Sequence, residues 1–70
     1  MTCYVPYDGR IKLDGYDVGL VYEHIDEYGN PRWWWSARVN GRGIDNYGAS
    51  RRYAFAAAVR DCEQEAAVIR

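Results

Sequence analysis

Residues 32–48, RWWWSARVNGRGIDNYG, decide the fold because they contain a complete two-stranded hairpin. Asn40-Gly41 is the dipeptide most typical of a two-residue hairpin turn, and strand-like alternation flanks it on both sides. A turn at this point predicts five cross-strand pairs: Val39 with Arg42, Ala37 with Ile44, Ser36 with Asp45, Trp35 with Asn46, and Trp34 with Tyr47.

The three consecutive tryptophans of this hairpin cannot all face the same way, because successive side chains of a strand point to opposite faces. One face is apolar and comprises Trp33, Trp35, Ala37, Val39 and Ile44. The other is mixed and comprises Trp34, Ser36, Arg38 and Asn40. We predict that Trp33 and Trp35 enter the core and that Trp34 stays more accessible.

A first hairpin is predicted around Asp14-Gly15, which suits a type I′ turn. Its expected pairs are Leu13 with Tyr16, Lys12 with Asp17, and Ile11 with Val18. This register turns six side chains toward the core: Ile11, Leu13, Tyr16, Val18, Leu20 and Tyr22. It leaves Lys12 and Asp17 as an ion pair on the outer face and also places Val21 and Ile25 there.

After Gly48 the pattern becomes helical, with Ser50 as the expected N-cap and no Gly or Pro from residue 51 to residue 70. One apolar stripe is predicted: Phe55, Val59, Cys62, Ala66 and Ile69. A helix with one such stripe and a sheet with one apolar face bury against each other. The expected fold is α+β, a single domain over residues 1–70, with a four-stranded antiparallel sheet of two hairpins and one C-terminal helix on one face.

Composition limits the classes of function. The chain has 70 residues and a net charge of −1, which argues against coating nucleic acid by bulk charge. Cys3 and Cys62 lack the spacing of metal ligands, and no apolar run is typical of a signal or membrane segment. We therefore expect a cytoplasmic protein with reduced thiols, no metal and no cofactor; a Cys3–Cys62 disulfide is the alternative.

Residues typical of catalysis are scarce. His24 is the single histidine and has no Ser, Cys or Asp motif around it, so it is expected to be a surface or strand-end residue and not a base. No phosphate-cradling glycine loop or nucleophile elbow is present. The sequence predicts a protein that is not an enzyme.

Arg51 and Arg52 fall in the first turn of the expected helix, where the macrodipole disfavours cations. Two explanations stay open. The arginines bind a partner or a phosphate at the helix N-terminus, or they pair with carboxylates from residues 1–31, which carry six acidic and two basic side chains.

Residues 22–62, YEHIDEYGNPRWWWSARVNGRGIDNYGASRRYAFAAAVRDC, resemble the C-terminal part of a double-stranded RNA-binding domain. Those domains run strand, Gly-Pro loop, strand, short turn, strand, and a helix that opens on a small residue and paired lysines, where this chain has paired arginines. The matching features are the loop 29–32, the turn Asn40-Gly41 and the helix start at residues 50–52. The resemblance implies that Arg32, Arg51 and Arg52 contact duplex phosphates.

The whole chain is also similar in type to orphan proteins of bacteriophages and mobile elements, among them anti-CRISPR proteins. It is short, aromatic-rich and mildly acidic, and eight of its nine basic residues are Arg. This similarity implies a stoichiometric inhibitor that binds a host defence complex, such as a CRISPR effector, in the bacterial cytoplasm.

The outer face of the sheet is the expected contact surface, because one helix covers only one face. The predicted register places Val21, Ile25, Trp34, Arg38 and Tyr47 there. Trp, Tyr and Arg are enriched at interface hot spots. Either residues 1–10 fold back over Trp34, or this face binds a protein partner or a second copy of the chain. We predict a non-catalytic protein-binding module that uses Trp34, Arg38, Tyr47, Arg51 and Arg52; the alternative is a duplex nucleic-acid binder, and no membrane partner is expected.

Overall fold

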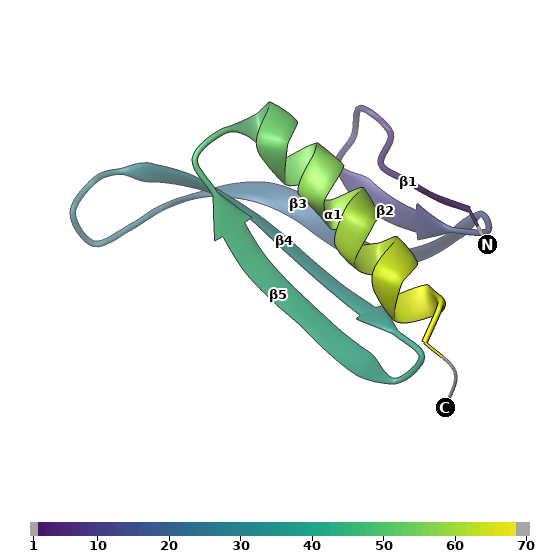
Figure 1. Ribbon diagram of the computed structural model, residues 1–70. Helices are drawn as coiled ribbons and strands as arrows, with labels where there is room; N and C mark the ends of the chain where they lie inside the picture. Colours follow the sequence, from purple (N-terminus) through teal and green to yellow (C-terminus); the bar gives the residue numbers. More distant parts are fainter. Residues whose placement is uncertain (1, 69–70) are drawn as a thin grey trace.

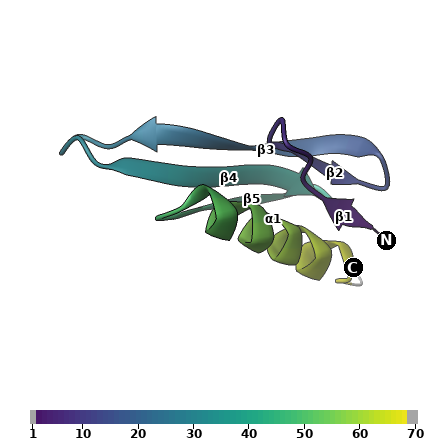
Figure 2. The same cartoon turned by 90° about the horizontal axis from the view of Figure 1, so that it is seen from above.

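The computed structural model describes residues 2–68, which form a five-stranded antiparallel sheet and one helix. The elements are β1 (Cys3–Tyr4), β2 (Arg10–Leu13), β3 (Tyr16–Ile25), β4 (Pro31–Val39), β5 (Arg42–Gly48) and α1 (Arg51–Ala66). Each strand pairs with the next along the chain, and α1 lies across one face of the sheet (Figures 1 and 2). We call the face under α1 the inner face and the opposite one the outer face. The predicted α+β class with one C-terminal helix is confirmed.

The predicted number of strands, four, is wrong because β1 was missed. This strand contributes only two pairs, Cys3 with Leu13 and Tyr4 with Lys12. Two residues are too few to show an alternating pattern, so the sequence of residues 1–10 does not predict β1. After β1, the chain stays on the α1 side of the sheet, where the carbonyl of Tyr7 accepts a hydrogen bond from Arg51. Residues 2–10 therefore do not cover Trp34, and that alternative is excluded.

Both predicted hairpin turns are confirmed. The central residues of each turn have positive φ, with 52° at Asp14, 88° at Gly15, 54° at Asn40 and 77° at Gly41. This is the type I′ geometry, whose twist matches that of paired strands. All five pairs predicted between β4 and β5 are present.

A β-bulge in β3 overturns the register predicted for the rest of that strand. Leu13 pairs with Tyr16 and Lys12 with Asp17 as predicted, but Ile11 pairs with Gly19 and not with Val18. Val18 is an extra residue on β3, so the alternation of side chains shifts by one position after it.

The shift exchanges the faces of four side chains. Val21, predicted on the outer face, pairs with Trp35 on the inner face and is buried. Ile25 shares the face of Val21 and is 60% exposed. Leu20 and Tyr22, predicted in the core, lie on the outer face.

Alanines make most of the contact between α1 and the sheet, together with Cys62. The buried residues of the helix are Ala54, Ala57, Ala58, Cys62 and Ala66. Phe55 and Val59, predicted in the apolar stripe, are only partly buried, and Ile69 lies outside the described residues. Small side chains let the helix come close to the sheet, where Trp35 fills the space between them with 1% of its surface exposed. Ser50 caps the helix as predicted, its side chain accepting from the backbone N–H of Tyr53.

Trp33 and Trp35 face α1 and Trp34 faces away, as predicted. Trp35 is fully buried as predicted. Trp33 was predicted to be buried as well, but it is only half-buried, as Trp34 is.

Cys3 and Cys62 join β1 to α1. Both thiols are free and buried, and their Sγ atoms are 2.8 Å apart. Burial, followed by the contact with Cys3, raises the pKa of Cys62 to about 12.

Candidate binding surface

Three aromatic side chains lie in register on the outer face, one on each of three adjacent strands. Tyr22 of β3 pairs with Trp34 of β4, which pairs with Tyr47 of β5. We call these three residues the aromatic ladder. The rings of Trp34 and Tyr47 are 4.8 Å apart between centroids and tilted by 36°, within the range of favourable aromatic pairs.

Trp34 occupies the middle of the ladder, which explains why it is half-buried on a face that no described segment covers. Its indole Nε1 is shielded from solvent and has no hydrogen-bond partner among residues 2–68. A buried donor without an acceptor costs ~1–3 kcal/mol.

Arg32 and Asp26 support one end of the ladder. The guanidinium of Arg32 lies 5.8 Å from the centroid of the Tyr47 ring, and its Nε is 3.6 Å from Asp26 Oδ2. The Asp26 carboxylate also accepts from the backbone N–H groups of Tyr28 and Asn30, each at 2.9 Å. The backbone bond from Asn30, then that from Tyr28 and the charge of Arg32, lower the pKa of Asp26.

The turn held by Asp26 borders a small cavity beside the ladder. The cavity has a volume of about 330 Å³, and Tyr28, Arg32, Trp34 and Tyr47 contribute to its lining. Tyr28 itself projects from the turn with 82% of its surface exposed. This end of the outer face therefore combines exposed aromatic surface with a turn that is fixed by hydrogen bonds.

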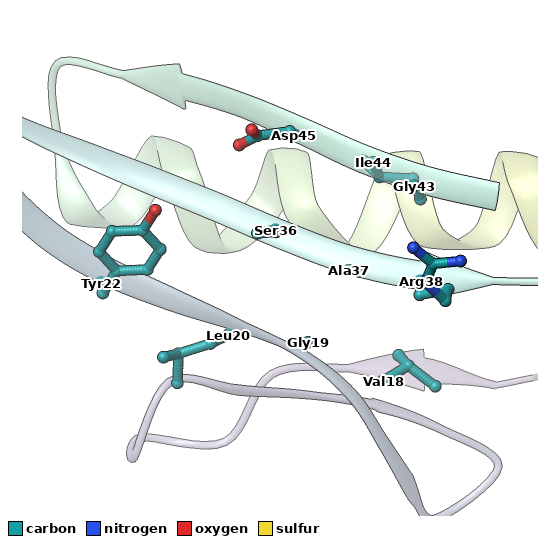
Figure 3. A pocket seen from close by; sticks show the side chains of 10 residues that line it. All are labelled: Val18, Gly19, Leu20, Tyr22, Ser36, Ala37, Arg38, Gly43, Ile44 and Asp45. Carbon is teal, nitrogen blue, oxygen red and sulfur yellow. The ribbon is translucent and has the colours of Figure 1, made fainter. Parts of the chain in front are cut away.

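A wider hollow of about 610 Å³ adjoins the other side of the ladder (Figure 3). Short side chains form its floor, with Ser36 on β4 and Gly43 on β5. Its surrounding side chains are Leu20, Tyr22, Arg38 and Asp45. The outer face thus has an aromatic ridge next to a depression.

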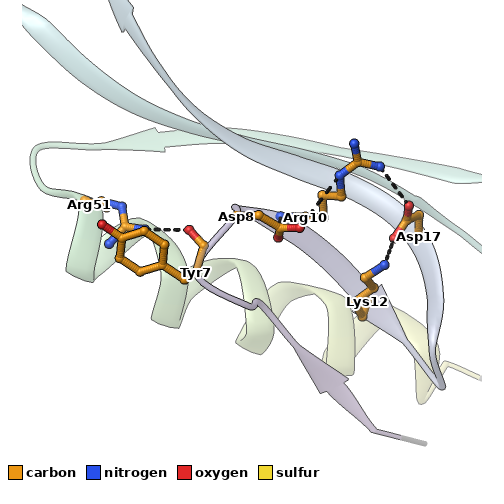
Figure 4. A network of polar contacts seen from close by, with 6 residues as sticks. All are labelled: Tyr7, Asp8, Arg10, Lys12, Asp17 and Arg51. Atoms are coloured by element: carbon orange, nitrogen blue, oxygen red, sulfur yellow. Dashed lines mark hydrogen bonds and ion pairs between the residues drawn. The ribbon is translucent and has the colours of Figure 1, made fainter.

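The charged side chains beyond the hollow are mutually neutralised. Asp17 pairs with Lys12 and with Arg10, whose Nη1 lies 3.2 Å from Asp17 Oδ2 (Figure 4). The hydrogen bond from Lys12, above all, lowers the pKa of Asp17. By contrast, the side chains of Arg38 and Asp45 make no ion pair or hydrogen bond with any residue in the described part of the chain.

The residues predicted to bind a partner are divided between two faces. Trp34, Arg38 and Tyr47 lie together on the outer face, whereas Arg51 and Arg52 begin α1 on the other side of the sheet. Leu20 and Tyr22 belong to the outer face and were missed. The only sequence signal for them was that the predicted register placed two apolar side chains, Val21 and Ile25, on the outer face.

Arg51 is held by the protein itself. Its Cζ lies 4.3 Å, 4.6 Å and 6.0 Å from the ring centroids of Phe55, Tyr7 and Trp33. Its Nη2 donates to the carbonyl oxygen of Tyr7 at 2.8 Å, a contact visible in Figure 4. Arg51 therefore contacts a backbone carbonyl and a ring from the first half of the chain. The expected alternative, an ion pair with a carboxylate from residues 1–31, is not found for Arg51 within residues 2–68. Arg52 is exposed.

No group of three or more His, Cys, Asp or Glu side chains in residues 2–68 has an arrangement that could hold a metal ion. His24 is exposed and pairs with Arg32 across β3 and β4. Within the same residues, no helix has the length and apolar character needed to cross a membrane.

Comparison with known proteins found no matching family model, no similar curated protein and no similar solved structure. The resemblances to double-stranded RNA-binding domains and to phage inhibitors therefore stay predictions.

Proposed function

We propose that the chain is a non-catalytic protein-binding module and that the outer face of its sheet is the contact surface. The aromatic ladder carries this proposal. An antiparallel sheet with one open face normally shows polar side chains to water. Here Tyr22, Trp34 and Tyr47 cross three strands of that face, with Tyr47 51% exposed.

The ladder has the properties of an interface hot spot. Aromatic side chains and Arg dominate binding energy when they are rigid before binding, because little side-chain entropy is then lost. Trp34 is held between its two neighbours, and Arg32 is held by Asp26 and Tyr47.

Capture of partners from a bacterial lysate by the tagged chain tests the proposal. Trp34→Ala and Tyr47→Ala should each lose the proteins retained by the unchanged chain. Tyr16→Ala is the matched control, because Tyr16 is 76% exposed and lies away from the ladder at the turn between β2 and β3. If the ladder variants and the control retain the same proteins, the outer face is not the contact surface.

The helix start needs a different probe. Because Arg51 packs against three rings, its replacement by Glu would disturb the fold as well as any partner. Arg52→Glu changes an exposed side chain and separates a binding role from a structural one.

The narrower proposal is a phage-type inhibitor whose partner is a host defence complex, such as a CRISPR effector. It rests on the size and composition of the chain, and identification of the captured protein by mass spectrometry tests it. Duplex nucleic-acid binding has less support, since Arg32 and Arg51 lie on opposite faces of the sheet and do not form one phosphate-binding surface. If the chain shifts duplex RNA in a gel at low salt, the nucleic-acid-binding alternative regains support.

A further inference from the structure

The outer face has the features of a surface that fits a copy of itself. The aromatic ladder and the wider hollow lie side by side along the same three strands. In a two-fold symmetric contact, each copy presents the same patch, so the patch must be complementary to itself. We propose that a second copy of this chain occupies the outer face and forms a two-fold symmetric dimer. This inference rests on the proposed binding role of that face and names its occupant.

The charges of the outer face also complement themselves. Arg10 and Lys12 pair with Asp17, Arg10 pairs also with Asp8, and Arg32 pairs with Asp26. On the outer face of β4 and β5, Arg38 is then a cation and Asp45 an anion whose side chains have no ionic partner in the described chain.

These two residues occupy adjacent positions of neighbouring strands, since Arg38 pairs with Gly43 and Ser36 pairs with Asp45. A two-fold axis that lies in the interface and passes between them brings Arg38 of each copy to Asp45 of the other. A heterologous partner would need a matching acid and base, whereas the second copy already carries both.

Pairing through the edge of the sheet is less favourable than this face-to-face contact. β5 is an edge strand, and the alternation that follows a two-residue turn directs the backbone N–H groups of Gly43, Asp45 and Tyr47 toward the open edge. The side chain of Asn46 already accepts from the N–H of Tyr47 at 2.8 Å. One of the three outward donors is therefore blocked for strand addition.

Two charge-reversal variants, alone and mixed, test the dimer by light scattering coupled to size exclusion. Arg38→Asp places two acids at each cross-copy contact, and Asp45→Arg places two bases there. Each variant should weaken dimerisation about tenfold or more, because like charges across an interface are strongly unfavourable. An equimolar mixture should return to the wild-type dimer affinity, because each contact between the two variants joins an acid to a base.

Circular dichroism of the two variants is the folding control, and both should keep the wild-type spectrum because both side chains are exposed. A monomeric wild-type chain at sub-millimolar concentration overturns the inference. Single variants that still dimerise, or a mixture that stays monomeric, also overturn it, because they exclude an Arg38–Asp45 contact across the axis. A monomer that captures a lysate protein through Trp34 overturns the dimer but leaves the proposed function standing.

Discussion

The indole N–H of Trp35 donates to the carboxylate of Asp61 across the interface between the sheet and the helix, with Nε1 and Oδ2 2.8 Å apart. This bond joins the largest fully buried side chain of the sheet to α1. Asp61 also pairs with Arg60, whose Nε is 3.3 Å from Oδ1. This contact with Asp61, above all, raises the pKa of Arg60.

Replacing Asp61 by Ala should destabilise the fold, because the buried indole N–H of Trp35 then has no acceptor. A lost partner of this kind costs ~1–3 kcal/mol, and each kcal/mol lowers the melting temperature of a domain this small by ~4–8 °C. Asp61→Asn keeps an oxygen acceptor and should lose less. Thermal melts followed by circular dichroism give both values, and equal losses for the two variants would contradict the role of the hydrogen bond.

The same contact shows what the sequence could not reveal about the helix. Judged by the macrodipole, an acidic side chain in the second half of α1 and two arginines in its first turn are all unfavourable. The structure resolves this for Asp61 and Arg51 through long-range contacts, with Trp35 and with Tyr7. Local rules cannot anticipate partners that are 26 and 44 residues away.

Elements set by local chemistry were predictable. The two type I′ turns follow from Asp14-Gly15 and Asn40-Gly41, and the register of β4 and β5 follows directly from the second turn. The bulge at Val18 was not predictable from alternation alone, and it moved Tyr22 from the predicted core to the outer face. The sequence therefore predicted two residues of the ladder, Trp34 and Tyr47, but not the third, Tyr22.

Gly19 should be intolerant of substitution because it lies at the bulge and against β4. A Cβ atom there would lie 2.6 Å from the Cα of Ala37, a backbone clash that no rotamer relieves. Gly19→Ala should strongly destabilise the chain, whereas Gly43→Ala, whose Cβ would meet nothing within 4 Å, should be close to neutral. Urea denaturation of both variants measures the difference. A stable Gly19→Ala protein would show that β3 and β4 are farther apart.

Oxidation should join Cys3 and Cys62 within one molecule, because their thiols are already in contact. With glutathione disulfide as oxidant, the two thiols lose two protons and two electrons, and two molecules of glutathione form. The reaction should be slow in the native state, since burial raises the pKa of Cys62 to about 12 and disfavours the thiolate.

The closed loop spans 59 residues, so the disulfide should stabilise the fold by ~4 kcal/mol. Mass spectrometry should show the loss of two hydrogen atoms from a monomeric chain. Cys3→Ser is the control, and a product containing only intermolecular disulfides would contradict the prediction.

Acid should weaken the fold through Asp17 and Asp26. The folded-state pKa of each is lower than its ordinary value, Asp17 through Lys12 and Asp26 through the backbone N–H groups of its turn. The stability that each contributes is fully present above the ordinary pKa of ~3.9 and is lost as the pH falls through the lowered value. Asp26→Asn keeps an acceptor oxygen but removes the titration, so its stability should depend less on pH below 4.

Denaturant midpoints measured from pH 7 to pH 2 give this dependence. Glu27→Gln is the matched control, because it removes a neighbouring carboxylate that takes no part in the hydrogen bonds of the turn. An unchanged pH profile for Asp26→Asn would refute the contribution of that carboxylate.

Substitution of Trp35 should affect stability, whereas substitution of Trp34 should affect binding. Trp35 is 1% exposed, and replacing a buried aromatic by Ala costs ~3–5 kcal/mol. A domain of 70 residues has a total stability of ~4–10 kcal/mol, so Trp35→Ala should leave much of the chain unfolded. Trp34 lies on the other face, where its loss opens no cavity under α1, so Trp34→Ala should keep a cooperative melt and lose the partner.

Circular dichroism melts of the two variants, together with capture experiments on the folded one, measure both effects. Trp33→Ala provides an intermediate case, because Trp33 is half-buried on the inner face beside Arg51. If Trp34→Ala proved the most destabilising of the three, the ladder would be part of the folding core, and the outer face would lose its role as a binding surface.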